Sequence, residues 1–178
     1  MIRERPEDGA GPARFERAAE QLRAMPAGTD RDRRLAAVHI GLADLHRRGG
    51  RYAEATAALT AARRLVRRHE TAIVMLLGVI AKEQGRFGEA ERHYARLERA
   101  GLNHSETAAL HHHLADLANA RYRFADAERH ARQALLLRRA DPRATAVDVA
   151  RDVAVLAAAV AGQHRYDEAR HLFGQALA

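Results

Sequence analysis

One five-residue pattern occurs four times in this chain of 178 residues, and it constrains the fold more than any other feature. The pattern is Arg, an aromatic residue, any residue, an acid and Ala. Its copies are residues 51–55, 86–90, 123–127 and 165–169, so the final Ala recurs at spacings of 35, 37 and 42 residues. Self-similarity at such a period indicates a protein built from stacked structural repeats.

Neighbouring positions repeat as well. Twelve residues before each Ala stands a small residue that follows a Leu, and these pairs are Leu42-Ala43, Leu77-Gly78, Leu114-Ala115 and Leu156-Ala157. Small residues on two helices let their backbones approach closely where the helices cross. If a helix begins at each pattern, the acid lies in its first turn, where a negative charge interacts favourably with the positive end of the helix dipole.

These residues, over roughly 31–178, resemble the tetratricopeptide-repeat family. The resemblance implies an all-α fold, a right-handed helical-repeat solenoid of antiparallel helix pairs with a concave groove. The four repeats are degenerate. The first-helix Trp and Tyr positions of the family hold other residues, such as His39 and Val74, and the Pro that ends a repeat is missing.

The organisation along the chain follows from the repeats. We expect residues 1–10 to be a disordered tail and residues 11–178 to form a single domain. Within it, a half-repeat helix over 12–25 precedes repeats at about 31–69, 71–100, 105–139 and 142–178. Asp30 and Asp141 are the expected N-caps of the helices that follow them. The longest spacing, 42 residues, implies longer helices in the last repeat.

Composition narrows the class of protein. Aromatic residues make up 4% of the chain and Cys is absent, which excludes disulfides. No secretion signal is present, and the longest apolar stretches are about ten residues against the roughly 20 that a membrane span needs. We therefore expect a cytoplasmic protein without a membrane partner. No Gly-rich phosphate loop, paired metal motif or nucleophile elbow occurs, so neither an enzyme nor a cofactor is expected.

The formal net charge of +7 invites a nucleic-acid partner, but the distribution argues against one. Lys82 is the only lysine, and the heavy use of Arg and Ala indicates a GC-rich bacterial genome. The basic residues also alternate with acids along most helices instead of forming one stripe. We expect a protein or peptide partner and no nucleic acid.

The resemblance places the binding surface on the first helix of each pair. The residues expected on that groove are Asp44, Arg47, Arg48, Met75, Lys82, His112, Asp116, Asn119 and Arg151. Arg forks recognise carboxylates, so an acidic peptide is a reasonable ligand of a scaffold or regulatory adaptor. The alternatives are a sensor or regulatory subunit that binds a small anionic ligand or signal peptide there, and an ordinary solvated row of arginines. The positions that grip chaperone tails in relatives hold other residues, so that activity is not expected.

Three consecutive histidines, His111, His112 and His113, suggest a metal site at first sight. Adjacent side chains on a helix point about 100° apart, so the three cannot share one ion. His111 is expected to pack in the core. His112 and Asp116, four residues apart on the groove side, offer two ligands or an acid–base pair, but no third ligand is apparent. We expect packing or a surface hydrogen bond here, and no metal.

The last helix presents an apolar edge at Phe173, Ala176 and Leu177. In relatives an extra helix shields such an edge, and the sequence ends at Ala178. Pairing of two identical edges is the simplest way to cover it, which predicts a homodimer. The alternative is that the last turn folds back or frays.

Overall fold

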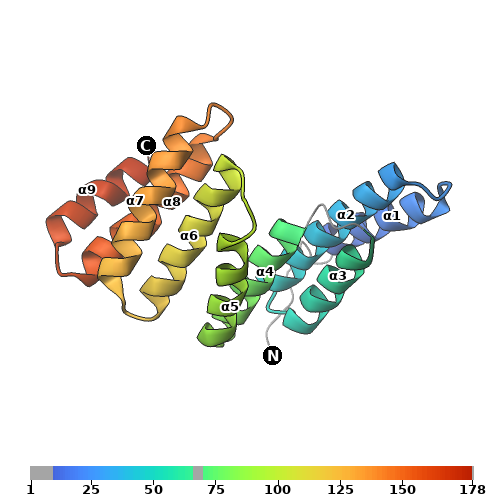
Figure 1. Cartoon of the computed structure of the whole chain (residues 1–178), viewed down its shortest axis with the longest axis horizontal. Helices are drawn as coiled ribbons and strands as arrows, with labels where there is room; N and C mark the ends of the chain where they lie inside the picture. Colours follow the sequence, from blue (N-terminus) through green and yellow to red (C-terminus); the bar gives the residue numbers. More distant parts are fainter. Residues whose placement is uncertain (1–9, 66–69, 178) are drawn as a thin grey trace. The chain divides into compact units, whose positions relative to one another are not determined.

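A computed structural model describes residues 10–65 and 70–177, and that part of the chain forms nine α-helices and no strand (Figure 1). The helices are α1 (Ala10–Ala24), α2 (Thr29–Arg48), α3 (Tyr52–Leu65), α4 (Glu70–Glu83), α5 (Phe87–Glu98), α6 (His104–Ala120), α7 (Phe124–Ala140), α8 (Ala146–Gly162) and α9 (Tyr166–Leu177). The chain divides into two compact units, Met1–Ile80 and Ala81–Ala178. The expected single domain over 11–178 stays a prediction, since stacked repeats can form compact units within one domain.

The predicted all-α fold is confirmed, and helix boundaries agree within a few residues at most positions. Most of the expected tail lies outside the described residues. The end of the first repeat, predicted at residue 69, lies outside them as well.

Two predicted caps are wrong. The helix α2 begins at Thr29, after Gly28, so Asp30 lies inside its first turn. The helix α8 begins at Ala146 instead of residue 142, because Thr145 and Asp148 form a capping box.

Small residues form the helix crossings, as the repeat pattern predicts. In the first unit α2 packs against α3, and in the second α6 packs against α7 and α8 against α9. The pattern alanines Ala55, Ala90 and Ala127 are completely buried, and Ala169 is 3% exposed. Larger residues such as Leu59 and Leu156 fill the space around these close approaches.

Every repeat closes its helix pair with the same turn. The residue before each pattern Arg has a positive φ, and these residues are Gly50, Gly85, Tyr122 and His164. In each case the N–H of the pattern Arg donates to a carbonyl five residues earlier, as in Arg123 to Ala118 and Arg165 to Val160. This left-handed conformation suits Gly and strains other residues. The two last repeats nevertheless place Tyr122 (φ 58) and His164 (φ 64) there.

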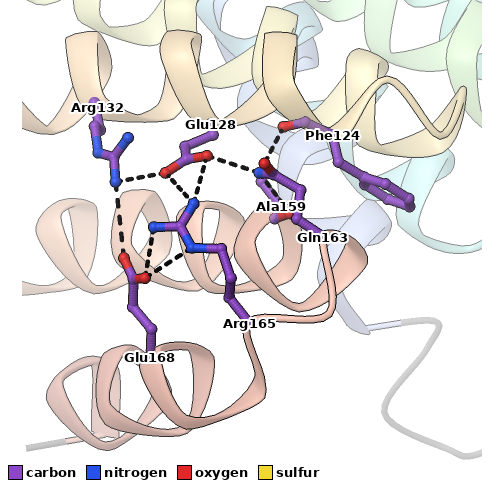
Figure 2. Close-up of polar contacts among 7 residues, drawn as sticks. All are labelled: Phe124, Glu128, Arg132, Ala159, Gln163, Arg165 and Glu168. Carbon is purple, nitrogen blue, oxygen red and sulfur yellow. Dashed lines mark hydrogen bonds and ion pairs between the residues drawn. The ribbon is translucent and has the colours of Figure 1, made fainter.

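Two pattern arginines of the second unit, Arg123 and Arg165, connect one repeat to the previous one, and Figure 2 shows the contacts of Arg165. The Nη1 of Arg165 donates to both carboxylate oxygens of Glu128 at 2.9 Å, and its Nη2 donates to Glu168 at 2.5 Å. Gln163 and Arg132 also donate to Glu128, which is 6% exposed. One repeat earlier, Arg123 donates to Glu91, the residue that follows the pattern Ala. Each such carboxylate therefore joins the second helix of one repeat to the turn of the next.

The long spacing of 42 residues comes from one helix. The helix α7 continues thirteen residues beyond Ala127, whereas α5 continues eight beyond Ala90. The following loops and first helices have equal lengths in the two repeats. The extra five residues, 136–140, form an added turn at the end of α7, next to the start of α8.

Candidate binding surface on the first helices of the second unit

The three adjacent histidines of α6 contact three different helices. The ring of His111 lies against His130 of α7, with their Nδ1 atoms 3.0 Å apart. The Nδ1 of His112 lies 2.7 Å from Oδ1 of Asp152 on α8. His113 stacks on Tyr94 of α5, with ring centroids 6.0 Å apart. The three rings therefore meet different helices, although those of His112 and His113 also contact each other edge to face, with centroids 5.3 Å apart. The carboxylate beside His112 is Asp152 rather than Asp116.

Asp152 is the most unusual residue of this surface, because it is a carboxylate with 1% of its surface exposed. Its Oδ1 accepts from His112 and its Oδ2 accepts from Nε of Arg138 at 3.2 Å. Since a carboxylate only accepts, the Nδ1 of His112 carries the proton of this bond. The side chains of His112 and Arg138 are themselves only 13% and 12% exposed. The result is a triad in which a buried Asp152 bonds to the partly buried His112 and Arg138.

Asp152 and Arg138, which were not predicted from the sequence, both lie where the chain departs from its repeat pattern. Asp152 stands five residues before Ala157, where the two preceding repeats hold buried Leu110 and Ile73. Arg138 lies on the added turn of α7. Neither residue was among the predicted site residues. Two features of the sequence could have indicated them: an acid at a repeat position that is otherwise apolar, and the unequal spacing of the repeats.

A pocket of about 170 Å³ opens beside the triad. Its lining residues are Ala109, His112, His113, Arg138, Asp148, Arg151 and Asp152. Asp148 belongs to the cap of α8, where hydrogen bonds from the hydroxyl and the N–H of Thr145 lower its pKa. Arg151 is exposed, and within the described residues its guanidinium makes no hydrogen bond or ion pair. Around the pocket, both oxygens of Asp152 and Oδ2 of Asp148 accept hydrogen bonds, whereas the guanidinium of Arg151 makes none among the described residues.

Two other residues predicted for the groove, Asp116 and Asn119, follow His112 on α6. Asp116, four residues after His112, accepts from Nζ of Lys82. Asn119, one turn further, donates through Nδ2 to the carbonyl of Val155 on α8 at 3.1 Å. The surface at 112, 116 and 119 is therefore fixed by bonds to other helices, which an ordinary solvated helix face does not require.

Behind this surface, His113 and Tyr94 are held neutral. Burial lowers the pKa of His113 to about 3, and the neighbouring His112 ring, Lys82 and Arg151 act in the same direction while Asp116 opposes them. Burial also raises the pKa of Tyr94, with further contributions from Asp116 and Glu83. The buried hydroxyl of Tyr94 has no hydrogen-bond partner among the described residues. These two rings are therefore uncharged and pack beneath the polar residues of the surface.

The remaining predicted groove residues belong to the first unit. Asp44 accepts from Arg47 at 2.8 Å and from Arg48 at 2.7 Å, so both arginines already have an acidic partner on their own helix. Met75 is 9% exposed and counts among the buried residues rather than the surface. Little of its side chain is exposed, and that Met75 faces a partner stays a prediction.

At the predicted dimer edge, the three residues differ. Phe173 is 41% exposed, while Ala176 packs against the core of the second unit. The side chain of Leu177 lies outside the described residues. Polar residues share the outer face of α9 with Phe173, and Arg170 and Asp167 form an ion pair there at 3.0 Å.

In the described part of the chain, no three His, Cys, Asp or Glu side chains are grouped so that they could hold a metal ion. No described helix is both long and apolar enough to span a bilayer.

Comparison with known proteins identifies the type of fold. No protein-family model matches the chain, and no curated protein matches it either. Among solved structures, it is similar to BtubC (BKLC) from P. vanneervenii, with a TM-score of 0.66 and 18% identity, covering 96% of this chain and 72% of that one. It is also similar to the TPR-like repeats of a Podosopora anserina protein described as a kinesin light chain, with a TM-score of 0.58 and 18% identity, covering 96% of this chain and 85% of that one. The chain therefore has a TPR-like helical-repeat fold.

Proposed function

We propose that this protein is a binding scaffold or regulatory adaptor, and that α6 and α8 of its second unit carry the surface that holds an acidic protein or peptide. One observation carries the proposal. Two polar side chains on α6, two turns apart, are each fixed by a residue of another helix, His112 by Asp152 and Asn119 by Val155. Side chains fixed in this way lose little freedom on binding, which favours recognition.

The expected charge of the binding partner follows from which Arg and Lys side chains are already paired with a carboxylate of this chain. Lys82 is paired with Asp116, and Arg47 and Arg48 are paired with Asp44. An incoming acid would have to displace these carboxylates. Arg151 lines the pocket and makes no ion pair among the described residues, although Asp148 of the same pocket is near enough to interact with it electrostatically. We therefore place the main contact with an acidic partner at Arg151.

Affinity capture from the source lysate tests this assignment. Wild type, Arg151→Glu and a matched control, Arg139→Glu, are immobilised at equal density. Arg139 is a suitable control because it is exposed, lies on α7 and does not line the pocket. Charge reversal at Arg151 should lower recovery of the partner at least about tenfold, since a charge-assisted hydrogen bond is replaced by repulsion. Equal recovery by all three proteins would place the partner elsewhere.

A second function, a sensor subunit that takes a small anion, is favoured by one observation, the pocket of about 170 Å³ at Arg151. Thermal-shift measurements with small carboxylates and phosphate compounds separate it from the scaffold function. A scaffold should respond only weakly to them, whereas a sensor should be stabilised by a particular anion.

We also propose that two copies associate through α9. The exposure of Phe173 and of Tyr166, 59% exposed near the start of the same helix, supports this. A two-fold arrangement would cover both copies of that face at once.

A further inference from the structure

The triad of His112, Asp152 and Arg138 is hard to explain by stability. Removing a carboxylate and a guanidinium from water lowers stability in general, and apolar replacements are often as stable or more so. This fold can place an apolar residue at position 152, since Leu110 and Ile73 occupy the same place in the preceding repeats. The charged arrangement therefore calls for another explanation.

The hydrogen-bonding groups of the pocket are unequally occupied. Both oxygens of Asp152 accept bonds, and the carboxylate of Asp148 accepts from Thr145. By contrast, Arg138 uses only its Nε toward Asp152, and its terminal nitrogens make no bond in the part of the chain that the structure describes. Together with the guanidinium of Arg151, the pocket thus offers donors and few open acceptors.

We propose that this pocket is an oxyanion subsite, which takes one carboxylate or phosphoryl group between the guanidinium groups of Arg138 and Arg151. Guanidinium groups match such oxygens in pairs, and Asp152 holds Arg138 in position from the buried side. The subsite deepens the proposed function, because it names the group of the partner that α6 and α8 recognise.

The size of the pocket agrees with a single group. Sites for whole cofactors or drug-sized ligands usually measure about 300–1,000 Å³. A pocket of about 170 Å³ is smaller and suits the end of one side chain or a small free anion. A metal cation is a poor match, because both carboxylates already accept hydrogen bonds from the protein.

Nuclear magnetic resonance of the arginine side chains tests the subsite in the full chain. The probes are inorganic phosphate, at ionic strength matched with chloride, a hexaglutamate peptide and a hexaglutamine peptide as its uncharged control. Phosphate or hexaglutamate should shift the side-chain N–H signals of Arg138 and Arg151, while hexaglutamine should not. Arg151→Gln should weaken the binding at least about tenfold, and Arg139→Gln should leave it unchanged.

A second variant keeps the test decisive if single changes disturb the fold. It replaces the whole triad by apolar residues, with His112→Leu, Arg138→Met and Asp152→Leu. Because no charge is left buried without a partner, this variant should fold and melt near or above the wild-type temperature. It should nevertheless lose the binding of phosphate and hexaglutamate.

The outcomes separate the source of the group from the existence of the subsite. Binding of hexaglutamate that phosphate displaces indicates a group carried by a peptide, and binding of phosphate alone indicates a free anion and the sensor function. The absence of binding by both probes, or equal affinity in wild type and the apolar variant, would overturn the subsite. Retained phosphate binding with lysate capture insensitive to Arg151→Glu would instead refute only the proposed function.

Discussion

At the scale of single residues, the consecutive histidines of α6 have different chemistry because they contact different neighbours. His112 faces a carboxylate and the pocket, whereas His111 lies against a second imidazole, His130. Burial lowers the pKa of His111, His113 and His130, and that of His39 in the first unit. These four rings are packed as neutral groups, and their protonation opposes folding.

The stability of the protein should therefore fall in mild acid. Below the ordinary histidine pKa of about 6.5, the unfolded chain gains a proton at residue 113. The folded chain does not gain it until the pH approaches about 3. The free energy of unfolding should then drop by about 1.4 kcal/mol per pH unit for this residue as the pH falls below 6.5.

Urea unfolding of wild type and His113→Phe between pH 7 and pH 4.5 measures this effect, with these pH values chosen to span about two units below the ordinary histidine pKa. Phe keeps a ring against Tyr94 but cannot be protonated. The variant should show a shallower pH dependence, by about one proton in the linkage slope. Identical slopes would mean that His113 titrates normally in the folded protein.

A second residue-scale prediction concerns the strained turn at Tyr122. This side chain is 81% exposed and its φ is 58°, where a residue with a Cβ is disfavoured. Tyr122→Gly should be more stable than Tyr122→Ala by about 1 kcal/mol, because only Gly adopts this conformation without strain. Thermal unfolding of both variants decides the matter. If the Ala variant were equally stable, the left-handed turn would be absent in solution.

At the scale of helices, the sequence was sufficient for much of the structure. Burial of the pattern alanines and the order of the helices follow from periodicity, because a small residue at a crossing has no substitute. The start of α8 was mistaken, since Asp141-Pro142 and Thr145-Ala146 are both good helix beginnings and the capping box of Thr145 with Asp148 prevailed. The triad was missed because Arg138 and Asp152 meet only through the added turn of α7. Such a contact depends on three-dimensional register rather than on local pattern.

The connection of α9 to α7 should depend on Glu128. Burial disfavours the ionised form of this residue, but hydrogen bonds from Gln163 and Arg165 outweigh it and lower its pKa. Glu128→Gln should cost about 2 kcal/mol, since it replaces charge-assisted bonds in a buried position. Glu168→Gln, at the exposed partner of the same Arg165, should cost less than about 1 kcal/mol.

Hydrogen exchange provides the measurement for this pair of variants. In Glu128→Gln, the amides of α9 should exchange faster while those of α6 are little changed. The stabilising contribution of the carboxylate is present above the ordinary Glu pKa of about 4.3 and is lost as the pH falls below it. Equal effects of the two substitutions would show that Glu128 is not the main link between these helices.

At the scale of the whole molecule, the exposed residues suggest two separate contact surfaces, one on α6 and α8 and one on α9. The proposed homodimer through α9 is tested by light scattering on wild type and on Phe173→Glu with Leu177→Glu. Wild type should have twice the monomer mass at tens of micromolar, and the variant should be monomeric because charges replace the apolar contact. A monomeric wild type or a dimeric variant would each reject this surface.

The central claim, that α6 and α8 of the second unit hold the partner, is tested most directly by site-specific photocrosslinking. A photoreactive amino acid replaces Ala109, which lines the pocket, or Ala158, which is exposed on α8, and Gln133, exposed on α7, serves as the control. After irradiation in the source lysate, the account predicts one crosslinked partner at positions 109 and 158 and little at 133. Crosslinks to the same partner at position 133, with none at 109 and 158, would contradict it.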